Sequence, residues 1–189
     1  MSDTSLRLEN HFLIAMPALN NPMFARSVIY ICEHHDKGTI GLIINQPLAY
    51  SWTYIFDQLH ITYDKTLNTS KPLLFGGPIQ SDRGFVLHRP SGNWSSSLTS
   101  SSQEVTITTS RDILQAIAKS EGPEDAVIVL GYVGWDSKQL EQEIKDNIWL
   151  ICPFTSELLY TVPYTERWNK AGLTLGINMD QLITGEGHA

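Results

Sequence analysis

Four residues whose side chains bind metals or act as nucleophiles and bases lie within five consecutive positions. They are Cys32, His34, His35 and Asp36. Thiolates, imidazoles and carboxylates are ligands of zinc, and a cysteine near a histidine is the pair that thiol nucleophiles use. A zinc site needs a second ligand cluster, and the sequence has no Cys-x-x-Cys, His-x-x-x-His or His-Glu-x-x-His. We therefore predict no metal site and interpret the adjacent histidines as solvated residues of a turn.

Residues 27–45 are predicted to form a β-hairpin with these side chains near its tip. Two β-branched apolar runs flank a polar segment that ends in Gly38, a residue that can adopt a positive φ. Both runs are apolar on both faces, which predicts a central position in the sheet with cover on each side. Strand alternation puts Cys32 and His34 on one face and His35 on the other. Burial in the strand would raise the pKa of the Cys32 thiol and disfavour the thiolate, so we predict no catalytic cysteine.

Other catalytic and nucleotide-binding patterns also fail to match. The sequence has no Gly-x-Ser-x-Gly elbow for a serine nucleophile. Gly131 and Gly134 follow an apolar run and precede a helical pattern, but the Gly-x-Gly-x-x-Gly spacing and a Walker lysine are missing. Bulky neighbours such as Tyr132 and Trp135 indicate a packed turn. We predict no catalytic residue and no cofactor.

The composition is that of a soluble globular protein. The chain has 189 residues, of which 42% are hydrophobic and 17% charged, enough for a substantial core in one domain. Its formal net charge of -7 opposes non-specific adhesion to nucleic acid or anionic lipid. The N-terminus lacks the apolar core of a signal peptide, and no apolar run approaches the roughly 20 residues of a membrane span. We therefore predict a cytoplasmic protein that does not bind membranes.

The basic residues do not form a nucleic-acid-binding face. The densest local set, Arg83, His88 and Arg89, is too sparse to follow a phosphate backbone. No pair of helical segments includes a recognition helix rich in Arg, Lys, Asn and Gln. Direct binding to nucleic acid is therefore not expected.

The remaining pattern predicts a single α+β domain over residues 11–189, preceded by a loose N-terminus over residues 1–10. Apolar runs bounded by turn residues predict strands at 11–16, 73–75, 85–88, 105–108, 126–132 and 148–152. Apolar residues at helical spacing predict helices after Ser51, after Ser110, after Asp136 and over residues 164–171. The serine-rich segment 95–102 is interpreted as a solvated loop. Consecutive strands and few helices argue against a doubly wound parallel sheet.

A series of short motifs extends along almost the whole chain. They include Phe12-Leu-Ile-Ala-Met-Pro17, Arg26-Ser-Val-Ile-Tyr-Ile-Cys-Glu-His34, Gly41-Leu-Ile-Ile-Asn45, Gly76-Gly-Pro78, Arg83-Gly-Phe-Val-Leu-His88, Thr109-Ser-Arg-Asp-Ile-Leu114, Leu130-Gly-Tyr132, Asn147-Ile-Trp149, Arg167-Trp168 and the closing Gly187-His-Ala189. In this order, they resemble the YqgE/AlgH-like family. So many ordered segments make a chance resemblance untenable.

The resemblance implies an α+β fold in which a split, mostly antiparallel β-sheet curls into a pseudo-barrel with helices packed outside. It implies no mechanism, because the family has no agreed catalytic motif to transfer to residues of this sequence. One branch of the family is named for transcriptional control of alginate synthesis, and members are often encoded beside a Holliday-junction-resolvase-like protein. The resemblance therefore leaves an unidentified protein partner open.

We interpret the chain as a cytosolic, non-enzymatic binding or regulatory module, because the family match is full-length and every catalytic template fails. An indirect role in transcriptional regulation is compatible with this interpretation. Arg26, Asn45, Arg83 and His88 are the predicted binding residues, because each adjoins an apolar strand or a glycine turn. For each of them, the alternative is a structural hydrogen bond that ties a loop to the sheet.

Two other functions remain as alternatives. The first is an enzyme with a small-molecule cleft near the segments from Gly76 to His88 and from Gly131 to Trp135, where polar groups would converge on a concave pocket. The second is a DNA-binding transcriptional regulator, which would show a steep salt dependence of its affinity.

Overall fold

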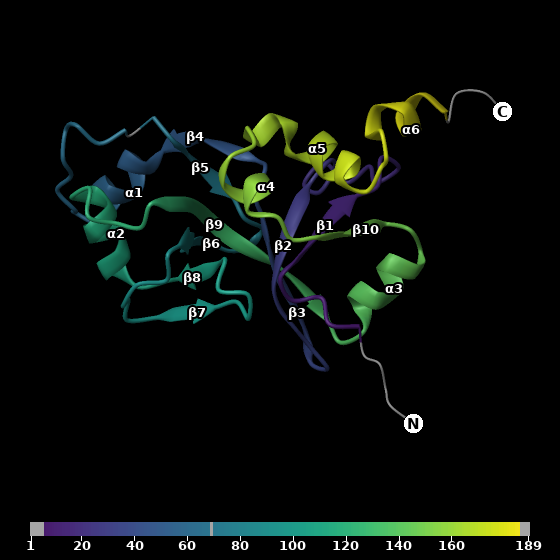
Figure 1. Cartoon of the computed structure of the whole chain (residues 1–189), viewed down its shortest axis with the longest axis horizontal. Helices are drawn as coiled ribbons and strands as arrows, with labels where there is room; N and C mark the ends of the chain where they lie inside the picture. Colours follow the sequence, from purple (N-terminus) through teal and green to yellow (C-terminus); the bar gives the residue numbers. More distant parts are fainter. Residues whose placement is uncertain (1–5, 69, 186–189) are drawn as a thin grey trace.

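The strand β9 (Asp125–Asp136) connects the two halves of a ten-stranded sheet (Figure 1). Its first half pairs antiparallel with β6 (Ile79–Arg89) and parallel with β5 (Pro72–Phe75). Its second half pairs antiparallel with β3 (Gly38–Ile43). The computed structural model describes residues 6–68 and 70–185.

The predicted hairpin lies in the middle of one half of the sheet. β2 (Val28–His35) pairs with β3, and β1 (His11–Ala15) and the edge strand β10 (Trp149–Pro153) follow, all antiparallel. Alternate residues of β2 enter two different hydrophobic cores, one on each face of the sheet. Both faces are therefore covered, and the prediction of a central hairpin is confirmed.

The other half of the sheet extends from β9 in two directions. β6 pairs with β8 (Thr106–Thr108) and then β7 (Ser97–Thr99), while β5 pairs with β4 (Pro47–Ser51). Among the described residues, only the β5–β9 pair is parallel. Tyr30 of the first half and Phe85 of the second half belong to one core, so the inner faces of the two halves meet. The curled, split and mostly antiparallel sheet is thus confirmed.

The short strand β7 corrects the interpretation of residues 95–102 as a solvated loop. β7 is exposed, but it pairs antiparallel with β8. The hydroxyl oxygens of Ser97 and Thr108 are 2.7 Å apart, and those of Thr99 and Thr106 are 3.0 Å apart. Such cross-strand hydroxyl pairs stabilise a strand whose composition alone indicates a loop.

Six α-helices and one short 3-10 helix surround the described sheet (Figure 1). They are α1 (Trp52–Gln58), α2 (Arg111–Ala118), α3 (Gln139–Lys145), α4 (Ser156–Tyr160), η1 (Tyr164–Glu166), α5 (Arg167–Thr174) and α6 (Met179–Gly185). The helices predicted after Ser51 and Ser110 are confirmed, although neither serine side chain caps its helix. Each group of helices encloses its own core: α1 and α2 at one end, α3 at the other, and α4 and α5 along the side between them.

Helix α3 is held against the sheet by one carboxylate. The Oε2 atom of Glu143 accepts hydrogen bonds from the indole Nε1 atoms of Trp135 (2.9 Å) and Trp149 (2.8 Å). Gln139 donates to Oε1 of the same group at 2.9 Å. This seven-residue helix is too short to be stable alone, so these contacts position it.

The turn predicted for residues 131–135 is wrong, because these residues lie inside β9. Gly131 has a φ of 76°, and a Cβ atom built on it would lie 2.2 Å from the carbonyl oxygen of Gly77. A Cβ on Gly77 would in turn meet the backbone of Tyr132 at 2.1 Å. The glycines therefore mark the close approach of two backbones within a sheet, and not a turn.

The N-terminal segment is packed where the structure describes it. Leu8 is buried, and the hydroxyl of Tyr30 donates to the side-chain oxygen of Asn10 at 3.0 Å. The rest of the predicted loose N-terminus, residues 1–5, and the closing motif 187–189 lie outside the described residues. Within the described ranges, no helix has the length and apolarity required to cross a bilayer.

Candidate functional site

A β-bulge separates the reactive side chains of the hairpin. The pairing of β2 with β3 shifts between Ile31 and Glu33, which makes Cys32 the extra residue. The bulge puts Cys32 and Glu33 on the same side, where both line the same cavities. His34 instead reaches α3, where its Nε2 atom lies 3.3 Å from Oε1 of Glu141. The prediction that Cys32 and His34 share a face is therefore wrong.

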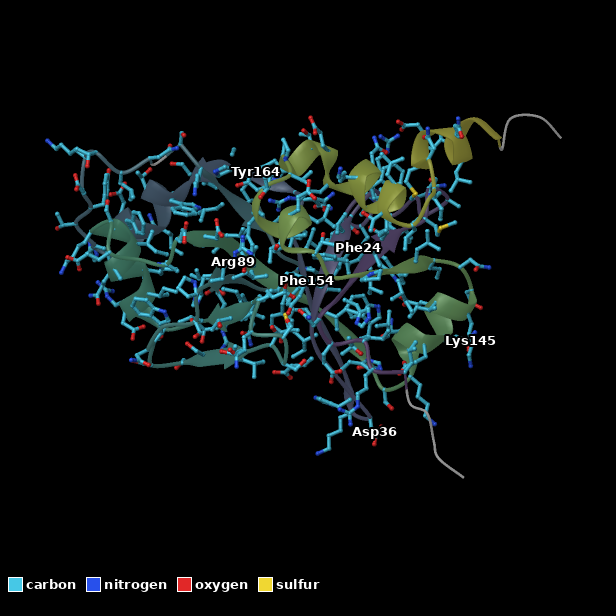
Figure 2. The ribbon with its side chains drawn as sticks, in the orientation of Figure 1. Phe24, Asp36, Arg89, Lys145, Phe154 and Tyr164 are labelled. Atoms are coloured by element: carbon cyan, nitrogen blue, oxygen red, sulfur yellow. The ribbon has the colours of Figure 1, made fainter. Side chains whose placement is uncertain are left out.

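His34 is not a solvated turn residue either. Its side chain is only 8% exposed, and its Nδ1 atom lies 2.7 Å from the hydroxyl of Thr39. Asp36 lies at the far tip of the hairpin, away from these contacts (Figure 2). In residues 6–68 and 70–185, no group of three His, Cys, Asp or Glu side chains is placed to hold a metal ion.

The two cysteines are free thiols in environments that disfavour the thiolate. Burial raises the pKa of Cys152 to about 11. Burial, and to a lesser extent the nearby Glu33 carboxylate, raise the pKa of Cys32 well above its ordinary value. A nucleophilic cysteine needs the opposite shift.

Arg26 and Asn45, two of the predicted binding residues, are brought together by the fold. Asn45 accepts a hydrogen bond from the backbone N–H of Val28 and donates one to the carbonyl of Arg26, both at 2.8 Å. The guanidinium of Arg26 lies 5.1 Å from the ring centre of Trp168. Both polar ends of the Asn45 amide are therefore used to tie the start of β2 to the segment that follows β3.

Arg83 and His88 lie on β6 in contrasting environments. Arg83 is exposed, donates to the side chain of Gln80 at 3.2 Å and lies over the ring of Phe85 at 5.2 Å. His88 is fully buried, with its ring nitrogens 3.0 Å from the carbonyl oxygen of Pro90 and 2.8 Å from the hydroxyl of Thr108. In the described part of the chain, the hydrogen bonds of Arg83 and His88 do not reach Arg26 or Asn45, so the four do not form one site.

Arg167, which sequence reasoning did not select, is the most enclosed cation of the described structure. It is 2% exposed and donates to the carbonyl oxygens of Val162 (2.9 Å), Leu159 (2.7 Å) and Ile44. Burial lowers its pKa to about 10, so it remains charged at neutral pH. Leu159 and Val162 are close to it in sequence, but Ile44 is 123 residues away, so no local signal identifies that contact.

A cavity of about 620 Å³ lies between helices α1 and α2 and the outer face of β6. We call it the α1–α2 cleft. Its apolar lining includes Leu48, Ile55, Leu59, Phe75, Leu114 and Leu130. Its polar lining comprises Gln58, Ser81, Asp82, Thr109 and Arg111. The cleft adjoins the segment from Gly76 to His88. A separate cavity of about 460 Å³ is lined by Arg83 and Phe85 of that segment and by Tyr132 of the segment from Gly131 to Trp135.

Two exposed tyrosines border the α1–α2 cleft. The rings of Tyr50, on β4, and Tyr54, on α1, are stacked with centres 4.3 Å apart and an angle of 27° between their planes. Sequence reasoning missed them, because Tyr50 lies in β4 and its stacking on Tyr54 depends on how the chain turns from β4 into α1. Exposed aromatic faces beside an apolar cavity are typical of ligand sites.

The curled, mostly antiparallel sheet and the helices packed against it define an α+β fold for the described residues. The sequence model of the AlgH-like family matches residues 12–180, and the chain belongs to that family. The resemblance inferred from the motifs is thus confirmed.

Relatives agree with this assignment over most of their lengths. A UPF0301 protein of Legionella pneumophila is 55% identical over 182 residues, which cover 96% of this chain and 97% of the relative. The solution structure of the AlgH protein from Pseudomonas aeruginosa covers 100% of both chains with 39% identity and a TM-score of 0.80. A Corynebacterium diphtheriae protein of known structure, 20% identical, covers 90% of this chain and 87% of its own with a TM-score of 0.67, and so shares the fold.

Proposed function

We propose that the chain is a non-catalytic binding protein whose α1–α2 cleft holds a compact, largely apolar ligand with a planar ring. The observation that carries this proposal is the cavity of about 620 Å³ beside the exposed Tyr50–Tyr54 stack. Its volume lies within the range of roughly 300–1,000 Å³ that is usual for small-molecule sites. A planar ring can stack on the outer tyrosine face while an apolar part enters between Ile55 and Leu114.

The polar residues of the cleft support binding more than catalysis. Asp82, Gln58 and Arg111 can orient a ligand through one or two hydrogen bonds, although Arg111 already donates to the carbonyl of Leu59. The described lining contains no histidine, cysteine or lysine that could act as a base for Ser81. We also place the protein in the cytoplasm and assign any effect on transcription to ligand or partner binding, because its net charge of -7 opposes DNA binding.

The test uses the fluorescent probe 8-anilinonaphthalene-1-sulfonate, a planar aromatic anion, with the full chain. We expect one saturable site per chain. Gly84→Leu should weaken binding about tenfold or more, because a Cβ at Gly84 lies 3.3 Å from the end of the Ile55 side chain and a leucine would fill the cavity. Tyr54→Ala should weaken binding without loss of fold, since Tyr54 is exposed.

Leu173→Ala is the matched control, because Leu173 is an exposed apolar residue on α5 that does not line the cleft. Equal binding by the wild-type chain and Gly84→Leu would contradict the proposal. The enzyme alternative predicts instead that the chain turns over ester, phosphoester or thioester substrates. Such activity, if abolished by Asp82→Asn or Ser81→Ala, would replace a binding role with a catalytic one.

A further inference from the structure

A second groove runs along the exposed strand β7, on the inner face of the curled sheet. It consists of two cavities, of about 510 and 460 Å³, that share Cys32, Glu33, Leu98 and Ile107. Every residue from Ser96 to Ser101 lines one cavity or the other, so the groove follows the whole strand. We call it the β7 groove. It shares none of the aromatic lining of the α1–α2 cleft.

The outer edge of β7 presents backbone groups that the sheet does not use. The N–H of Thr109 donates to the carbonyl of Ser96 at 3.0 Å, and that of Ser100 to the carbonyl of Val105 at 2.8 Å. In this antiparallel register, the even-numbered residues of β7 face β8. The N–H and C=O groups of Ser97 and Thr99 therefore point away from β8, and β7 has no second neighbour in the described sheet.

This edge lacks the features that usually protect an edge strand from pairing. Proteins guard such edges with lysines, other charges, prolines or bulges. Residues 95–102 consist only of serine, threonine and leucine. Leu98, at the centre of β7, is 49% exposed, so an apolar side chain placed beside it would bury surface that is now in water.

The groove offers both apolar and charged contacts to an added strand. Leu98 and Ile107 are directly paired across β7 and β8, and the bulge turns Cys32 toward them from β2. Glu33 lines both cavities, its side chain is 45% exposed, and Nε2 of His35 lies 3.8 Å from its carboxylate. A lysine or arginine side chain in the groove would therefore meet a weakly paired carboxylate.

We propose that β7 binds an extended segment of a partner protein as an additional antiparallel or parallel strand. Alternate side chains of that segment, mainly apolar with one lysine or arginine opposite Glu33, enter the β7 groove. A basic segment also suits the net charge of -7. Pairing of β7 with β7 of a second copy is a poorer fit, because residues 95–102 offer one apolar side chain, Leu98, and no lysine or arginine for Glu33.

The test selects random peptides displayed on phage against the full wild-type chain. We expect enriched peptides that alternate apolar and polar residues and contain a lysine or arginine. Ser97→Pro removes a backbone N–H that β8 does not use, so the chain should keep its fold. Its affinity for the selected peptides should fall about tenfold or more. Ser97→Ala is the matched control, because it loses the same hydroxyl contact to Thr108 but keeps the backbone N–H.

Modified peptides provide a measurement that leaves the protein unchanged. N-methylation at alternate positions of a selected peptide should abolish binding in one register and be tolerated in the other. No enrichment, equal binding to Ser97→Pro, equal effects of both methylation registers, or dimerisation of the free chain through β7 would overturn the proposal.

Discussion

His88 is held in one protonation state by two hydrogen-bond partners of different kinds. The carbonyl oxygen of Pro90 can only accept, so Nδ1 carries the proton and donates to it. Nε2 then accepts from the hydroxyl of Thr108, which can accept in turn from the hydroxyl of Ser97. Burial lowers the pKa of His88 below its ordinary value of 6.5. The residue is therefore neutral in the folded chain and stabilises the pairing of β6, β8 and β7.

This arrangement predicts a loss of stability in mild acid. Because the pKa of His88 is lower in the folded than in the unfolded chain, the unfolded chain binds the proton first. The stabilisation is complete above about pH 6.5 and falls as the pH decreases below it, by at most about 1.4 kcal/mol per pH unit. Urea unfolding between about pH 7.5 and pH 5 measures the slope. His88→Asn should flatten it.

His60→Asn is the control for this prediction. His60 is exposed and has a φ of 54°, a conformation that asparagine tolerates. Its replacement should leave the pH dependence of the unfolding free energy in place. An unchanged slope in His88→Asn would show that other groups cause the acid sensitivity.

Elements far apart in the sequence are joined by single side chains. Arg167 connects α4, the segment before η1 and the end of β3 through three carbonyl oxygens. The indole of Trp168 donates to the carbonyl of Ala15 at 2.8 Å and attaches α5 to β1. Asn45 performs the same task between β2 and β3. Short helices depend on such contacts because they have little stability of their own.

Arg167→Met should therefore lower the free energy of unfolding by about 2–4 kcal/mol, since it leaves three buried carbonyl oxygens without donors. Arg167→Lys should recover only part of the loss, because an ammonium group lacks the planar fork of the guanidinium. The measurement is urea unfolding followed by tryptophan fluorescence. Lys170→Met, on the exposed side of the same helix, should change stability by less than about 0.5 kcal/mol.

The whole molecule depends on β9, because all three hydrophobic cores include residues of this strand. Val127 and Val129 enter the inner core, Ile128 packs under α1 and α2, and Val133 packs under α3. The two halves of the sheet should therefore unfold together. The contact between Gly131 and Gly77 is where β9 passes from one half to the other.

Gly131→Ala should destabilise the chain by about 3 kcal/mol or more, because alanine is strained at a φ of 76° and its Cβ would overlap the backbone of Gly77. Gly134→Ala, in the same strand, should lower the free energy of unfolding by less, since its Cβ would meet the flexible end of the Ile79 side chain at 3.1 Å. Urea unfolding curves from tryptophan fluorescence and far-UV circular dichroism should coincide for both variants. Separate transitions would show that the two halves are independent.

Sequence reasoning identified the elements whose signals are local. The spacing of Ile113, Leu114 and Ile117 marked α2, and the apolar runs on both sides of Gly38 marked the central hairpin. It failed where distant contacts decide the conformation. The glycines of β9 indicated a turn, yet they lie within a strand, where the backbone of Gly77 requires a glycine at position 131. The serines of β7 indicated a loop, yet their pairing with β8 makes them a strand.

The candidate site was predictable only in part for the same reason. The segment from Gly76 to His88 was selected from its glycines, and its middle residues do line the α1–α2 cleft. The other walls of the cleft come from α1, α2 and β4, which only the folded chain brings together. Tyr50 and Tyr54 read as ordinary surface aromatics until their rings are seen to stack beside a cavity.

The alternation of side chains along β6 has a thermodynamic consequence. Gly84 faces the α1–α2 cleft, its neighbours Arg83 and Phe85 face the β7 groove, and Thr109 lines both. A ligand on one face and a strand on the other would thus be separated by the thickness of a single strand. If either shifts β6 in a way that favours the other, their affinities are linked, and each must raise the affinity of the other by the same factor.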